Sequence, residues 1–139
     1  MDIKDKIKTF DDICKIAGIN PELLFKQTSE LEYLQDTING IIAFEKLLII
    51  NQVLNQGWRP DWNNRTQYKW YPYFDLSSGG FSFVDAYCRY GRTYAGVGSR
   101  LCYKTKNDAE FAGKLFIDIY RTFMVYDNLK RNIIFEKLK

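Results

Sequence analysis

Few residues in this chain could perform chemistry, and their types restrict what that chemistry can be. The sequence contains no histidine, which removes the side chain whose pKa lies nearest neutrality and, with it, nucleophile pairs of the Ser-His and Cys-His kinds. The three cysteines, Cys14, Cys88 and Cys102, do not have the spacing of zinc ligands. We therefore expect no metal ion and no other cofactor, and we expect free thiols that fill small apolar spaces.

Carboxylates are the remaining candidates for acid–base chemistry. Asp61, Asp75 and Asp85 are the acids of the aromatic region, and two of them together could hold Mg²⁺ or act as general acid and base. Their spacing follows no pattern of such sites, and aspartate is common at turns and strand ends. From Gly96 the chain has part of a phosphate-binding loop, but Leu101 occupies the position of the last glycine. The sequence therefore predicts a protein that is not an enzyme.

The region 57–103 is crowded with aromatic rings and arginines. It contains all three tryptophans and five arginines, and it has six basic against three acidic residues. Bases stack on exposed rings, and guanidinium groups pair with phosphates. The preceding residues 1–56 have six lysines against nine acidic residues, whereas residues 104–139 have eight basic against five acidic residues. This distribution permits an anionic partner without requiring one.

We expect this region to form a surface that binds nucleic acid or a nucleoprotein machine through stacking and phosphate pairing. The residues expected to form it are Arg59, Trp62, Arg65, Lys69, Trp70, Tyr71, Arg89, Arg92, Tyr94 and Arg100.

The same residues also have structural interpretations, which stay open at this point. The elbow Trp58-Arg59-Pro60-Asp61-Trp62 could pack its two indoles on a neighbouring helix. A helix could also cover the second face of the aromatic strand that begins at Tyr68. Arg89, Arg92 and Arg100 could be ordinary solubilising charges.

Two short helical segments are predicted near the start of the chain. Thr9 and Asp12 have the spacing of a capping box, and Gly18 marks the end of the helix that they begin. Asn20-Pro21 then opens a second short turn or helix, because proline is favoured at the first helical position.

The clearest helix is predicted over residues 41–56, which are apolar on most of the helix circumference. Such a helix lies at the centre of a core. Ser29 and Glu32 form another capping-box pair, for a helix over residues 31–38, and Asn39-Gly40 is expected to interrupt it.

From Tyr68 onward the residue pattern predicts strands instead of helices. An aromatic strand over 68–76 is followed by a turn at 77–80 and by the period-two alternation of 81–85. A third strand is expected over 94–103, weakened by its glycines. Together they predict an antiparallel meander of about three strands over residues 68–103.

The last part of the chain returns to helical spacing. Thr105 and Asp108 cap a helix that is expected to continue to Val125. Gly113 in its middle costs about 1 kcal/mol against alanine, which indicates close packing against another element. Residues 126–139 could form a helix or a strand, and we favour a helix.

These elements predict an α+β fold in which helices pack on one face of a small antiparallel sheet. By length the chain is expected to be a single domain, residues 1–139. Its parts are helical over 1–57, an aromatic β meander over 58–104, and a C-terminal helix and tail over 105–139. The start lacks an apolar signal segment, and no apolar run approaches the roughly 20 residues of a membrane span. We therefore expect a cytoplasmic protein without a membrane partner.

Several stretches of the sequence resemble a family of small uncharacterised proteins of Bacteroidetes and of their phages and mobile elements. The resemblance covers most of residues 9–124. The stretches that carry it are 9–12 to Pro21, 41–62 with Gly57-Trp58-Arg59-Pro60-Asp61-Trp62, 69–74 (Lys-Trp-Tyr-Pro-Tyr-Phe), 77–79, 98–104 (Gly-Ser-Arg-Leu-Cys-Tyr-Lys) and 112–120.

The resemblance implies a context rather than an activity, so no catalytic residues are carried over. It implies a small, free-standing accessory protein of a phage or mobile element. The alternative function that follows is an anti-defence inhibitor of the anti-CRISPR kind, which binds and blocks a host nuclease effector through protein–protein contact. Its contact surface could include the acidic N-terminal part or the C-terminal tail.

Overall fold

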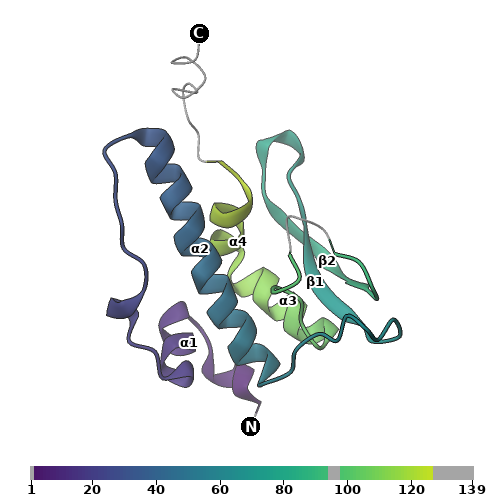
Figure 1. Ribbon diagram of the computed structural model, residues 1–139. Helices are drawn as coiled ribbons and strands as arrows, with labels where there is room; N and C mark the ends of the chain where they lie inside the picture. Colours follow the sequence, from purple (N-terminus) through teal and green to yellow (C-terminus); the bar gives the residue numbers. More distant parts are fainter. Residues whose placement is uncertain (1, 94–97, 127–139) are drawn as a thin grey trace.

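The computed structural model describes residues 2–93 and 98–126, apart from the side chains of residues 32 and 33 (Figure 1). Within these residues four helices and a two-stranded antiparallel sheet are joined by short 3₁₀ turns, which confirms the predicted α+β class. The elements are η1 (Ile3–Lys6), α1 (Phe10–Ala17), η2 (Pro21–Leu23), α2 (Glu32–Asn55), β1 (Lys69–Asp75), η3 (Ser77–Gly79), β2 (Ser82–Arg89), α3 (Lys106–Leu115) and α4 (Ile117–Met124).

The long helix α2 lies at the centre of the arrangement (Figure 1). It contacts α1 on one side and α3 and α4 on the other, and the sheet packs against α3. Leu47, Ile50 and Leu54 of α2 are buried in the resulting core. By length and composition alone, Leu34–Asn55 could cross a membrane, so the expectation that no apolar run is long enough is wrong. Central helices of globular proteins have the same properties, and the burial of these side chains explains the composition here.

The cap of α1 is confirmed in detail. The Thr9 hydroxyl accepts the Asp12 N–H at 3.4 Å, and the Asp12 carboxylate accepts the Thr9 N–H at 3.0 Å. Hydrogen bonds from the backbone N–H groups of Lys8 and Thr9 lower the pKa of the Asp12 carboxyl group. Gly18 ends the helix with a φ of 70°, the left-handed conformation that glycine adopts without steric cost.

Two expectations for α2 are wrong. Ser29 does not cap the helix, because its hydroxyl accepts the N–H of Leu31 and the helix begins after that residue. Asn39-Gly40 does not interrupt it either. The Asn39 side chain accepts a hydrogen bond from Gln35 at 2.8 Å, one turn earlier, and at Gly40 the helix passes close to α4. The helix therefore continues through Asn39-Gly40 without a break.

The strands β1 and β2 pair in antiparallel register, with Trp70 opposite Cys88 and Tyr71 opposite Tyr87. A bulge at Val84 follows the pairing of Tyr73 with Asp85. The meander of about three strands is corrected to two strands. Residues 94–97 of the expected third strand lie outside the described residues, and residues 98–103 make only one bridge, between Tyr103 and Trp70. This segment bonds to α2 instead, as described below.

Alternate residues of β1 face opposite sides. Pro72 and Phe74 face the core, where Phe74 contacts Phe81, Phe83 and Tyr120. Helix α3 thus covers one face of the aromatic strand. The other face keeps exposed rings, since Tyr73 and Tyr87 pack edge to face at 5.0 Å and each is nearly half exposed.

The predicted helix from Thr105 to Val125 is divided into α3 and α4. The Thr105 cap is confirmed, since its hydroxyl accepts the Asp108 N–H at 3.0 Å. The break falls at Phe116, a buried residue whose φ of −108° and ψ of 29° leave the helical region. The change of direction lets α3 pack on the sheet while α4 packs on α2.

Candidate nucleic-acid interface

Three separate segments build a pocket at the C-terminal end of α2, which we call the elbow pocket. Its volume is about 540 Å³. Gln56 and Gly57 have φ angles of 47° and 90°, so the chain reverses directly after α2, and Trp58 donates its N–H to the Asn55 carbonyl. This reversal returns the elbow to the side of the helix. The pocket is lined by Leu48, Asn51, Gln52, Gly57, Trp58, Arg59, Pro60, Ser99 and Arg100.

Two buried asparagines of α2 hold the third wall of the elbow pocket in place. The side-chain amides of Asn51 and Asn55 both donate to the Cys102 carbonyl, at 2.7 and 3.0 Å. The Asn55 side-chain oxygen accepts the Lys104 N–H at 3.0 Å. We call these contacts the asparagine clamp. Because the clamp fixes residues 102–104 on α2, it positions Arg100 beside the elbow.

The elbow pocket is electropositive. Arg59 and Arg100 are exposed, and no acidic residue lines the pocket. Within the part of the chain that the structure describes, neither guanidinium has a carboxylate partner. The C-terminus of α2 contributes only about half a negative charge. Two full positive charges therefore dominate the local potential.

Lys69 does not belong to an exposed surface, although the sequence places it there. It is fully buried, and its ammonium donates to the carbonyls of Asn64, Gln67 and Tyr90 at 2.8, 3.2 and 2.8 Å. The ammonium also lies 5.1 Å from the ring centre of Trp62, a cation–π contact. Lys69 and Trp62 thus tie the loop after the elbow to the end of β2.

We expect the replacement of Lys69 by methionine to lower the free energy of unfolding by about 1–2 kcal/mol. The loss follows because three carbonyls lose a charged donor, and it stays moderate because Asn64 and Tyr90 are near solvent that can replace it. Urea unfolding followed by tryptophan fluorescence measures it. Lys8→Met is the control, because the exposed Lys8 side chain has no partner among the described residues, and it should change stability by less than about 0.5 kcal/mol.

The remaining predicted residues are in mixed environments. Tyr71 is buried, so its ring is not accessible to a ligand. Trp70 is half-buried between the ring of Tyr68 and the Lys106 ammonium, and Arg89 is half-buried opposite Lys69. Tyr94 lies outside the described residues.

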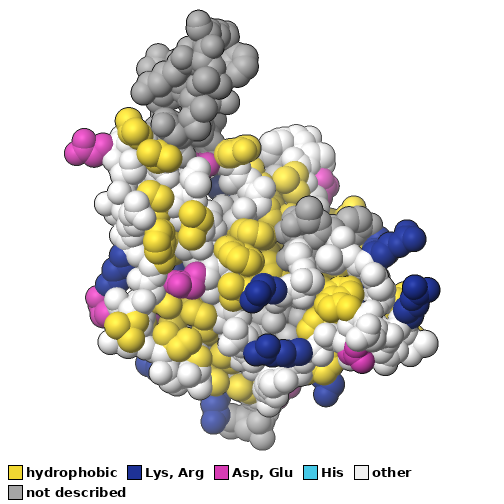
Figure 2. Space-filling model, in the orientation of Figure 1, with side chains coloured by type: hydrophobic (Ala, Val, Ile, Leu, Met, Phe, Trp, Pro, Cys, Tyr) yellow, Lys and Arg dark blue, Asp and Glu magenta, His cyan; other side chains and the backbone are white. Residues whose placement is uncertain are grey.

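A second exposed group of rings and cations lies at the open end of the hairpin, which we call the Tyr68–Tyr90 cluster. The two rings are 5.3 Å apart, and both are about half exposed. Burial and the neighbouring Tyr68 raise the pKa of Tyr90. Arg65 lies beside Gly91, and Arg92 follows in the chain; both arginines are exposed. On the face of the molecule that Figure 2 shows, Lys and Arg side chains lie beside hydrophobic ones at the centre and on the right.

The structure thus brings Arg59 and Arg100 together and places Arg65 and Arg92 in a separate cluster. Sequence reasoning missed Trp58, Gln52 and Ser99 as lining residues of the elbow pocket. For Trp58 the signal was present in the elbow motif, but packing on a helix was the favoured interpretation. For Gln52 the only signal was its place on the thin polar stripe of α2.

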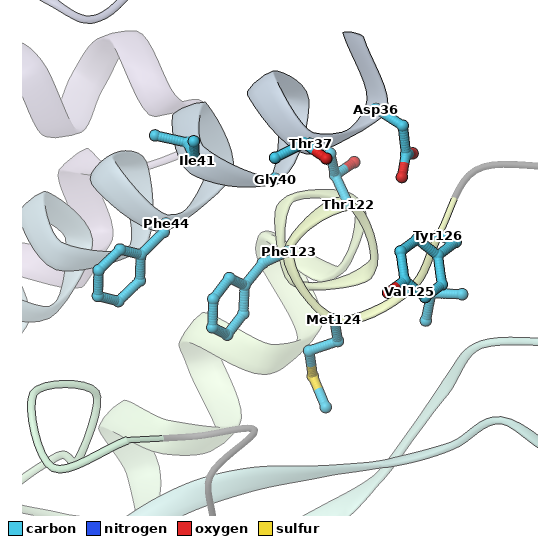
Figure 3. A pocket seen from close by; sticks show the side chains of 10 residues that line it. All are labelled: Asp36, Thr37, Gly40, Ile41, Phe44, Thr122, Phe123, Met124, Val125 and Tyr126. Atoms are coloured by element: carbon cyan, nitrogen blue, oxygen red, sulfur yellow. The ribbon is translucent and has the colours of Figure 1, made fainter. Parts of the chain in front are cut away.

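A different surface, the α2/α4 groove, is predominantly apolar (Figure 3). Its volume is about 480 Å³, and Phe44 and Phe123 stack in its wall at 5.4 Å. Ile41 is 49% exposed and Tyr126 is 82% exposed, so both offer apolar surface at the groove. The groove is lined by Asp36, Thr37, Gly40, Ile41, Phe44, Thr122, Phe123, Met124, Val125 and Tyr126.

No three Cys, Asp and Glu side chains of the described residues are placed to hold a metal ion together. Burial raises the pKa of Cys102 to about 11, so its thiol stays protonated at neutral pH and is a poor nucleophile. Comparisons with known proteins add no assignment: no family model, no curated protein and no solved structure matches the chain.

Proposed function

We propose that this protein binds single-stranded nucleic acid, free or within a nucleoprotein machine, without catalysing a reaction on it. The observation that carries the proposal is the elbow pocket, where two exposed guanidinium groups lie beside a half-buried indole and no carboxylate is present among the described lining residues. Guanidinium groups form paired hydrogen bonds with phosphate oxygens. An indole can stack on any base, so this arrangement favours unpaired strands over duplexes.

The Tyr68–Tyr90 cluster supports the same function at a second position. Its two half-exposed rings offer stacking surfaces, and Arg65 and Arg92 supply charge beside them. Proteins that bind single strands without sequence preference combine stacking rings with a positive track. Trp62 and Lys69 act in this proposal by holding the intervening loop and not by touching the ligand.

We expect Arg59→Ala and Arg100→Ala each to weaken binding of a labelled single strand about tenfold at low salt, because each removes one charged contact to phosphate. Fluorescence anisotropy across a salt series measures the effect, and the salt dependence should become less steep by about one ion for each arginine. Arg121→Ala, an exposed arginine of α4, is the matched control and should bind as the parent does. Parental binding by both pocket variants would exclude the elbow pocket as the site.

The second candidate function is the blocking of a host nuclease effector by protein–protein contact, in the context of a phage or mobile element. It is supported by the α2/α4 groove, whose exposed Ile41 and Tyr126 suit an apolar side chain of a partner. One stoichiometric protein partner, lost with Ile41→Glu and retained with Arg100→Ala, would favour this function. Binding of a labelled single strand that is lost with Arg100→Ala and retained with Ile41→Glu would instead favour nucleic-acid binding.

A further inference from the structure

We infer that the elbow pocket receives the phosphorylated end of a strand rather than an internal phosphodiester. This inference rests on the proposed function and assigns a ligand class to the same pocket.

The elbow pocket is lined by three segments of the chain. The last turns of α2 form one wall with Leu48 and Gln52, the elbow forms a second with Trp58 and Arg59, and the Ser99-Arg100 segment forms a third. An internal nucleotide needs a path for the chain on both sides. A terminal nucleotide needs only one, so a pocket lined by three converging segments suits the end of a strand.

The charge of the ligand also distinguishes a terminal phosphate from an internal one. A phosphate monoester carries about −1.5 to −2 charges at neutral pH, whereas a phosphodiester carries one. Coulomb energy scales with the charge of the ligand, so the two exposed guanidinium groups favour the monoester. An extended backbone is contacted more effectively by cations spread along a track, but Arg59 and Arg100 line one pocket although they are far apart in the chain.

Two neutral side chains that line the elbow pocket can also form hydrogen bonds with a ligand. Within the described residues, the side chains of Gln52 and Ser99 make no hydrogen bond to protein. Both remain available for phosphate oxygens or a terminal sugar hydroxyl. Asn51 also lines the pocket, but its amide is used by the asparagine clamp. The pocket therefore places an indole ring, two guanidinium groups and two neutral hydrogen-bonding side chains around one space.

The test measures binding of one short labelled oligonucleotide in three forms: with a 5′-phosphate, with a 3′-phosphate and with hydroxyl groups at both ends. DNA and RNA versions are compared at one fixed low salt. We expect one phosphorylated form to bind roughly tenfold more tightly than the hydroxyl form. This preference should decline below about pH 6, where the monoester dianion takes up a proton and becomes a monoanion.

Arg59→Ala and Arg100→Ala should abolish the preference, and Arg121→Ala should retain it. A Gln52→Ala variant keeps both charges and should reduce the preference only in part, which guards against loss of folding in the arginine variants. Equal affinity for all three forms would overturn the inference and leave nucleic-acid binding intact. Absence of binding by every form at low salt would instead overturn the proposed function.

Discussion

Replacing Asn55 by leucine is expected to lower the free energy of unfolding by about 3 kcal/mol and to abolish binding at the elbow pocket. Asn55 is buried and serves three partners: its amide donates to the Cys102 carbonyl and the Asn51 side chain, and its oxygen accepts the Lys104 N–H. Leucine leaves the Lys104 N–H and the Asn51 oxygen without these partners. Each buried unpaired group costs about 1–3 kcal/mol.

Urea denaturation followed by tryptophan fluorescence measures the stability, and anisotropy at low salt measures the binding. The matched control is Asn107→Leu, an exposed asparagine on α3 with no hydrogen-bond partner among the described residues. It should change the stability by less than about 0.5 kcal/mol. An Asn55→Leu protein that unfolds at the parental urea concentration would show that the asparagine clamp does not hold residues 102–104.

The second large effect is expected for Gly113→Ala, which should destabilise the protein by about 2 kcal/mol. Alanine gains about 1 kcal/mol of helix propensity over glycine. Its Cβ would, however, lie 2.6 Å from the Pro72 Cβ and 2.8 Å from the Phe83 ring. Carbon atoms in contact are normally about 3.5–4.0 Å apart, and neither the proline ring nor the packed phenyl ring can move away freely. Overpacking of this kind typically costs about 1–3 kcal/mol, so steric repulsion outweighs the gain.

Gly40→Ala provides the matched comparison, because Gly40 is also a glycine within a helix. There the nearest heavy atom to a new Cβ is the Thr122 carbonyl oxygen at 3.7 Å, an ordinary contact. We expect a stabilisation of up to about 1 kcal/mol from reduced freedom of the unfolded chain. Thermal unfolding should therefore shift in opposite directions for the two variants. A shift in the same direction would contradict this account of the helix–sheet and helix–helix contacts.

Local sequence determined the features that depend on neighbours in the chain. The Thr9 and Thr105 caps, the left-handed Gly18 and the aromatic strand β1 all follow from residue types within a few positions. So does the centre of α2, because its apolar residues leave only a thin polar stripe. The close approach at Gly113 was also predicted, because a glycine within a helix requires a reason of this kind. These features suffice for the α+β class.

Tertiary contacts decided the features that depend on residues far apart in the chain. Residues 98–103 make a single bridge to β1 and add no strand, and buried asparagines of α2 bond the Cys102 carbonyl and the Lys104 N–H that follow this path. As a lysine beside aromatic residues, Lys69 was predicted to lie on the binding surface. It is buried instead, and three loop carbonyls accept hydrogen bonds from its ammonium group. The α2/α4 groove lies where α2 and α4 pass each other near Gly40 (Figure 3). From the sequence alone, this glycine was predicted to interrupt the helix.

The candidate site divides in the same way. The sequence by itself determined that rings and guanidinium groups would provide the binding chemistry and that histidine would not. Only the tertiary structure decided that Arg59 and Arg100 share one pocket while Arg65 and Arg92 lie in another cluster. The physical reason is that residue types fix which interactions are available, whereas the left-handed turn after α2 and the asparagine clamp fix which side chains meet.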